Sequence, residues 1–138
     1  MGLAKRIETR SWYTHYRGPM VIHAAKNYPK WAKKLAATDA FRQGLGCHLG
    51  PQTLPLGVGL CVVRIVACVK TTELHKLAAI GFQPQVNERM FGNFEEGRYA
   101  WALEHLYDFI EPVPAKGAQG LWTWPINKSW GVLKLTCT

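Results

Sequence analysis

The sequence predicts an α+β fold in which several short strands form a small β-barrel or a strongly bent sheet, with one or two inserted helices. Short alternating or apolar runs outnumber the helical stretches, and 13 glycines and 8 prolines interrupt the chain. Domains rich in short strands and turn residues favour closed or bent sheets. The 138 residues are 48% hydrophobic, which is enough to bury one core of ordinary size.

The two N-terminal runs are predicted to be strands that form a hairpin. In the run 5–12, the alternation places Glu8 and Arg10 on one side, roughly 7 Å apart along an extended backbone. The run 17–25 is the second strand, and the five-residue link 13–17 suits a hairpin. Charges on neighbouring strands are costly unless they are paired, so these strands predict a polar cleft for a charged ligand.

The middle of the chain predicts a helix, a loop and the central strand. The helix covers 29–43, because Pro29 is tolerated in a first turn and glycines follow its end. The stretch 47–57 is rich in Gly and Pro and lacks periodicity, which indicates a loop. The run 59–71 is apolar and rich in Val and Ile, as expected of a strand covered on both faces.

The C-terminal half predicts a second long strand between shorter elements. These are a short helix over 73–79, a loop over 81–87, a strand over 98–110, a glycine-bearing loop over 115–120 and weak strand character over 132–136. No internal repeat or low-complexity segment interrupts them.

Composition narrows the possible partners. Seventeen Lys and Arg against nine Asp and Glu give a net charge of +8. This charge favours binding of a polyanion such as nucleic acid, but a basic surface that only keeps the protein soluble explains it equally well. The four cysteines form no Cys-x-x-Cys pair, so neither a metal nor another cofactor is expected. The longest apolar stretch, 58–69, is broken by Arg64 and is too short to span a membrane. With no signal peptide in view, a cytoplasmic location is expected.

Four sequence blocks in a fixed order resemble the ASCH domain family, a branch of the PUA-like barrels. They are Glu8-Thr9-Arg10-Ser11-Trp12, then Tyr16-Arg17-Gly18-Pro19 leading to Ile22-His23-Ala24, then Phe91-Gly92-Asn93-Phe94 with Gly97-Arg98-Tyr99-Ala100-Trp101, then Lys116-Gly117-Ala118-Gln119-Gly120-Leu121-Trp122. The resemblance implies a PUA-like β-barrel of about five or six strands with flanking helices, and a cleft that binds nucleic acid, usually RNA. It implies a domain over 1–125 and leaves 126–138 as a tail.

The family signature Gly-x-Lys-x-x-Glu-x-Arg matches from position 3 to position 10, except that Leu3 replaces the glycine. Family members usually carry a strand and a helix before this signature. The chain is therefore either a shortened variant or one whose tail near 132–136 supplies the missing strand.

Side-chain chemistry, together with the resemblance, selects the candidate site. An Arg fork, a Lys point charge and a carboxylate suit a phosphate or a nucleobase, although an ion pair at a barrel rim has the same composition. Trp12 and Tyr13 could stack a splayed base, although a Trp at a strand end also suits a core plug. His23 suits a hydrogen-bonded barrel position better than a proton shuttle. Lys116 beside glycines resembles an anion-binding nest. The predicted ligand-binding residues are Lys5, Glu8, Arg10, Trp12, Arg17, His23, Arg98, Lys116 and Gln119.

The function predicted first is a module that binds RNA or a modified nucleoside. The alternative is a small hydrolase, either a ribonuclease or an enzyme similar to acetylcytidine amidohydrolase, with Lys5 as general base and Glu8 passing the proton. The amidohydrolase branch has Thr where this chain has Glu8, which weakens that alternative. A role in protein interaction alone is a third, weaker hypothesis.

Overall fold

The computed structural model describes residues 6–27, 56–84, 92–118, 120–123 and 134–137, with single positions at 30, 34, 38 and 89. Six strands and two short helical elements occur in this part of the chain, which confirms the α+β class. The strands are β1 (Ile7–Arg10), β2 (Pro19–Ala24), β3 (Val58–Lys70), β4 (Tyr99–Pro114), β5 (Leu121–Thr123) and β6 (Lys134–Cys137). The helical elements are the 3-10 turn η1 (Thr71–Glu73) and the helix α3 (Leu74–Ala78).

The strands form one sheet with the order β1-β4-β3-β2-β6-β5. β1 pairs antiparallel with the start of β4, whereas β6 runs parallel to β2 and antiparallel to β5. The predicted hairpin of the two N-terminal strands is therefore wrong, because β4 and β3 lie between them in the sheet. The link 13–17 is instead a loop closed by Arg17, whose Nη1 donates to the carbonyl oxygens of Thr14 at 2.7 Å and Tyr16 at 3.0 Å.

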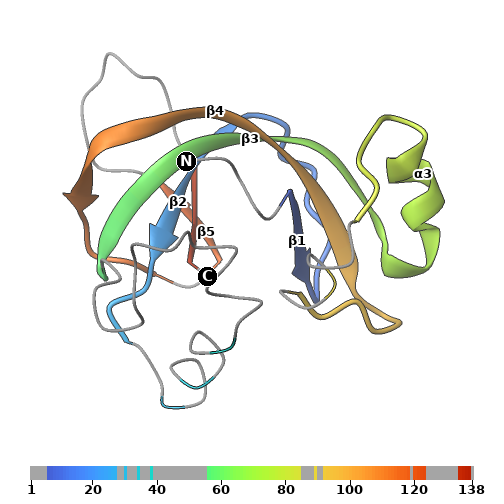
Figure 1. Cartoon of the computed structure of the whole chain (residues 1–138), viewed down its shortest axis with the longest axis horizontal. Coiled ribbons are helices and arrows are strands. Elements are labelled where there is room, and N and C mark those ends of the chain that lie inside the picture. Colours follow the sequence, from blue (N-terminus) through green and yellow to red (C-terminus); the bar gives the residue numbers. More distant parts are fainter. Residues whose placement is uncertain are drawn as a thin grey trace. The chain divides into compact units, whose positions relative to one another are not determined.

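The predicted central strand is confirmed as β3, which lies beside β4 (Figure 1). The two strands are antiparallel, since the Thr71 amide donates to the Arg98 carbonyl at 2.9 Å and the Ala115 amide donates to the Gly57 carbonyl at 3.0 Å. β4 extends to Pro114, four residues beyond the predicted end. β1 pairs only with the first residues of β4. The later residues of β4 therefore donate no hydrogen bonds to β1, and proline, which has no amide donor, is tolerated among them.

Of the remaining predicted elements, some are present in the structure and others lie mostly outside the described residues. The short helix expected over 73–79 is present as η1 and α3, and the weak strand expected over 132–136 is present as β6. Apart from positions 30, 34 and 38, the predicted helix over 29–43 lies outside the described residues, as does most of the loop over 47–57. The domain boundary at residue 125 stays a prediction.

The chain groups into two compact units. Unit 1 comprises residues 1–18 and 64–105, and unit 2 comprises residues 19–63 and 106–138. In unit 1, buried Ile7, Leu77, Ala100 and Ala102 form a core with Val66, Ala67, Val69, Leu74, Phe82 and Phe94 around them. In unit 2, buried Val21 and Val62 pack with Phe109, Val113, Ala115 and Trp122. Among the described residues, no helix has the length and apolar character needed to cross a membrane.

Candidate functional site

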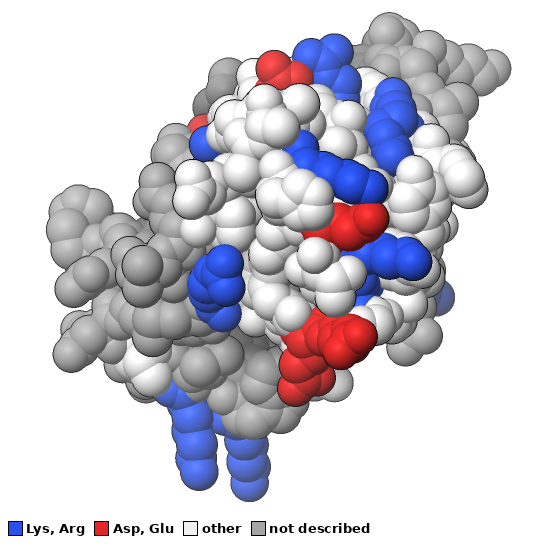
Figure 2. Space-filling view, turned by 90° about the vertical axis from the view of Figure 1, so that its right-hand side faces the viewer, with Lys and Arg blue, Asp and Glu red and all other residues white. Residues whose placement is uncertain are grey.

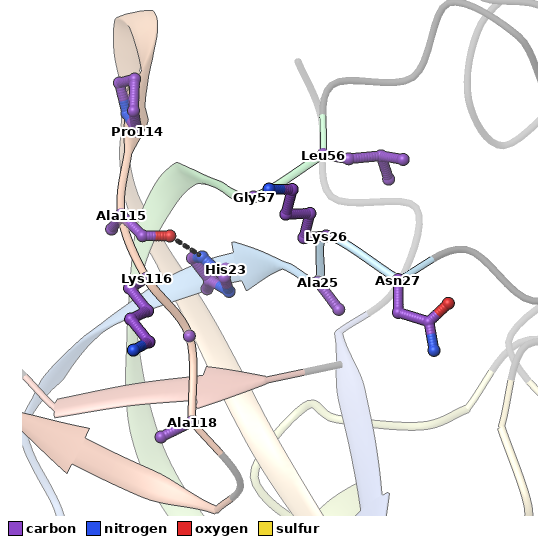
Figure 3. A pocket seen from close by; sticks show the side chains of 11 residues that line it. His23, Ala25, Lys26, Asn27, Leu56, Gly57, Pro114, Ala115, Lys116 and Ala118 are labelled. Atoms are coloured by element: carbon purple, nitrogen blue, oxygen red, sulfur yellow. Dashed lines mark hydrogen bonds between the residues drawn. The ribbon is translucent and has the colours of Figure 1, made fainter.

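Unit 2 contains a pocket of about 860 Å³, here called the His23 pocket (Figure 3). Three separate segments line it: the end of β2, the start of β3 and the loop after β4. Its lining residues are His23, Ala25, Lys26, Asn27, Leu56, Gly57, Pro114, Ala115, Lys116, Gly117 and Ala118. Its volume lies in the range of about 300 to 1,000 Å³ that is usual for small-molecule sites.

The His23 side chain is fixed in the wall of this pocket. It is 1% exposed, and its Nε2 donates to the Ala115 carbonyl oxygen at 2.9 Å (Figure 3). The Trp122 ring meets the imidazole edge to face at 5.6 Å between centroids. Gly117 lies so close that an added Cβ would be 2.7 Å from His23 Cε1. The ring is therefore held by a hydrogen bond and by close packing.

The described charged residues in the lining of the His23 pocket are both basic. Lys26 and Lys116 are exposed and line it, and none of the lining residues that the structure describes is Asp or Glu. Neither lysine has an ion-pair partner within the part of the chain that is described. Seven of the eleven lining residues are Ala, Gly, Leu or Pro. Apolar walls beside two ammonium groups suit a flat organic group that carries a negative charge.

In unit 1, the two charged residues predicted to share a face of β1 contact each other. Arg10 Nε lies 3.2 Å from Glu8 Oε1, and the side chains are 23% and 11% exposed. Glu8 lies opposite the fully buried Trp101 on β4. A largely buried ion pair holds the guanidinium in one direction, because leaving either charge alone would be costly.

Arg98 and Arg17, both predicted to bind a ligand, donate hydrogen bonds to backbone carbonyls. Arg98 donates from Nε to the Asn93 carbonyl at 3.1 Å and from Nη2 to the Thr9 carbonyl at 3.3 Å. It thereby ties the loop before β4 to β1, just as Arg17 closes the loop after β1. In both residues, guanidinium N–H groups donate to backbone carbonyl oxygens. Each residue therefore has a structural role in addition to any contact with a ligand.

Trp12 is a partly exposed ring that packs on the core of unit 1. It is 38% exposed and meets Trp101 edge to face at 4.7 Å between ring centroids. Its neighbour Tyr13 is 40% exposed. These exposures are too large for the core plug considered for Trp12, and they leave aromatic surface open to solvent.

The charged side chains are mixed on the face shown in Figure 2, where acidic groups lie between basic ones. The net charge of +8 therefore does not produce one uninterrupted positive surface on that face. Local pairs of cations, such as Lys26 and Lys116, are a better guide to anion binding than the total charge.

Two predicted residues, Lys5 and Gln119, lie outside the described residues. The single cleft predicted for Lys5, Glu8, Arg10 and Lys116 therefore stays a prediction. Sequence reasoning missed Lys26 and Asn27, although Lys26 directly follows a predicted strand that contains His23. A search for polar residues just beyond strand ends would have found both.

Comparison with known proteins adds one match. The family model described as ASCH domain matches residues 4–112, most of the chain. Comparison with curated proteins gives no significant match.

Proposed function

Because the chain belongs to the ASCH domain family, we propose that it is an RNA-binding module that holds one nucleotide in the His23 pocket. The observation that carries the proposal is the combination of small apolar walls with Lys26 and Lys116, which lack carboxylate partners in the described part of the chain. A base packs on the apolar surface, and the lysines bind its phosphate as point charges. A modified nucleoside within RNA fits the same chemistry.

The proposal includes the signature residues of β1. Arg10 is held by Glu8 at 3.2 Å, which supports a fixed guanidinium at this position. In unit 1, we assign Arg10 to an acceptor group of a bound RNA and Lys5 to one of its phosphates, with Glu8 orienting Arg10. A carboxylate with this orienting role is less suited to passing a proton, so the binding module is favoured over the hydrolase.

We further propose that the six strands complete a PUA-like barrel. The sheet of six strands and the family match support this proposal. A strand-pairing map of the full chain tests it, because a barrel requires the strands at the two ends of the sheet order to pair.

A reducing, cytoplasmic location is also proposed. Cys61 and Cys68 are free and buried, as is usual where thiols stay reduced. Fractionation of cells that express the full-length protein tests the location.

The test of RNA binding uses a fluorescent single-stranded RNA and two charge-removing variants, Lys26→Gln and Lys116→Gln. Each variant is expected to weaken binding and to lower the slope of log K against log salt by about 0.7, the value for one lost phosphate contact to a single strand. Lys70→Gln is the matched control, since Lys70 is an exposed lysine that does not line the pocket.

Three results would contradict the proposal. They are no binding by the wild-type protein at about 50 mM salt, binding that is insensitive to salt, or equal losses in the Lys70 control and the pocket variants. Incubation with acetylcytidine and with single-stranded RNA tests the alternative, because product formation would indicate a hydrolase.

A further inference from the structure

An exposed aromatic group in unit 1 is separate from the His23 pocket. We call it the Tyr13 cluster, and it comprises Tyr13 with His15, Arg17 and Tyr99. Tyr13 meets the His15 ring at 4.7 Å and 64°, and the Tyr99 ring at 5.7 Å and 81°. The guanidinium carbon of Arg17 lies 5.8 Å from the Tyr13 centroid, within the reach of a cation–π contact.

The Tyr13 ring is both fixed and open. Arg17 Nη2 donates to the Tyr13 hydroxyl oxygen at 3.1 Å, and the same guanidinium closes the loop through two carbonyls. The loop is anchored at Thr14, which is 4% exposed and whose Oγ1 accepts a hydrogen bond from the Tyr16 amide. Tyr13 nevertheless stays 40% exposed, and both neighbouring rings meet it at steep angles. A flat ligand can therefore stack on it without first ordering the loop.

We propose that the Tyr13 cluster stacks one unpaired base and so gives the protein a preference for single-stranded RNA over duplex RNA. This inference rests on the proposed RNA binding and adds which form of RNA is bound. Any base has a π-face, so stacking on a tyrosine is tolerant of sequence. The Arg17 guanidinium lies over one face of the ring, 5.8 Å from its centroid, so a base stacks on the other face and the positive charge favours the nearby phosphate.

The composition of the cluster favours this ligand over an apolar protein surface. A protein hot spot needs a desolvated pocket around its aromatic anchors, whereas Tyr13 lies beside a cation and a histidine in a polar loop. A duplex is also a poorer ligand, since its bases are already stacked on each other and expose only their edges.

The experiment compares Tyr13→Leu with Tyr13→Phe in the full chain. Leucine keeps apolar volume but lacks a π-face, whereas phenylalanine keeps the ring and loses only the hydroxyl that accepts from Arg17. We expect Tyr13→Leu to weaken binding of a labelled single-stranded RNA by about five- to 150-fold, the measured range for one stacked base. Tyr13→Phe should stay within about threefold of the wild-type protein, and duplex RNA of the same sequence should be unaffected by either change.

The control is Tyr107→Leu, because Tyr107 is 39% exposed and also meets a ring, Phe109, edge to face at 6.2 Å. Chemical denaturation of each variant shows whether it is folded. The inference is overturned if Tyr13→Leu binds single strands within about twofold of the wild-type protein, if it weakens duplex binding equally, or if the Tyr107 control loses as much. If Tyr13→Leu binds single-stranded RNA as tightly as the wild-type protein while Lys116→Gln binds it more weakly, this inference is overturned and the proposed function stands. Failure of the wild-type protein to bind any RNA would overturn the proposed function itself.

Discussion

Replacing Gly117 with alanine is expected to destabilise the protein through one contact, that with the His23 ring. The new Cβ would lie 2.7 Å from His23 Cε1 and 3.1 Å from Nδ1. Carbon atoms in optimal contact are about 3.5 to 4.0 Å apart, so one of the two groups has to move by close to 1 Å. The ring cannot move freely, because its Nε2 donates to Ala115 and it is 1% exposed. Overpacking of this kind costs about 1 to 3 kcal/mol.

A double-mutant cycle isolates this contact. In a His23→Ala background the space occupied by the ring is empty, so Gly117→Ala should lose most of its cost and give a coupling of about 1 to 3 kcal/mol. The matched control is Gly120→Ala. Gly120 has φ +73° and nothing within 4 Å of an added Cβ. Its substitution should cost about 1 to 2 kcal/mol from the left-handed backbone alone, equally in both backgrounds.

Urea unfolding of the four proteins in each cycle supplies the free energies, and the NMR signals of the His23 ring report its displacement. Gly117→Ala is also expected to weaken RNA binding, since Gly117 lines the His23 pocket. The reasoning would be refuted if Gly117→Ala cost the same in both backgrounds, or if it cost less than about 0.5 kcal/mol in the wild-type protein.

Three further predictions concern other parts of the fold. Burial raises the pKa of the Cys61 thiol from 9.0 to about 11, so at neutral pH the fraction of thiolate is about a hundredth of that in the unfolded chain. Alkylation of Cys61, measured by mass spectrometry, should therefore be slower in the folded protein by about that factor. A rate within about tenfold would contradict this. Arg64→Ala removes an ion pair with Glu104 whose side chains are 48% and 46% exposed, so urea unfolding should show a loss of about 1 kcal/mol or less, and a loss above about 2 kcal/mol would be unexplained. Thr71→Val removes the Oγ1 donor that lies 2.7 Å from the Glu95 carbonyl at a 7% exposed position, which should cost about 1 to 3 kcal/mol in the same assay; a neutral substitution would show that this hydrogen bond is not needed.

Predictions that depended on local pattern were confirmed where the structure describes the chain. The Val- and Ile-rich run became β3, and the short helix formed directly after it. Glu8 and Arg10 share a face of β1 because side chains two residues apart on a strand point the same way. These features need only neighbouring residues, so a sequence contains enough information to predict them.

Predictions that required knowing which distant strands pair were wrong, as for the hairpin, or left out residues of the His23 pocket. The hairpin was wrong because a five-residue link is compatible with a tight turn, yet β1 found its partner in β4, about 90 residues later. Arg17 and Arg98 stay predicted ligand residues, and their hydrogen bonds to backbone carbonyls were not predicted because these form only once the loops are folded. The polar residues beyond β2 were missed for the same reason.

The amino-acid order alone determined the α+β class, the charge alternation on the first strand and the membership implied by four ordered blocks. The folded chain decided which of these residues meet. The His23 pocket joins residues near 25, 56 and 116, and the Tyr13 ring meets Tyr99 across a gap of 86 positions. Contacts of this kind are set by the pairing of distant strands and the closure of long loops, and no periodicity within a short window records them.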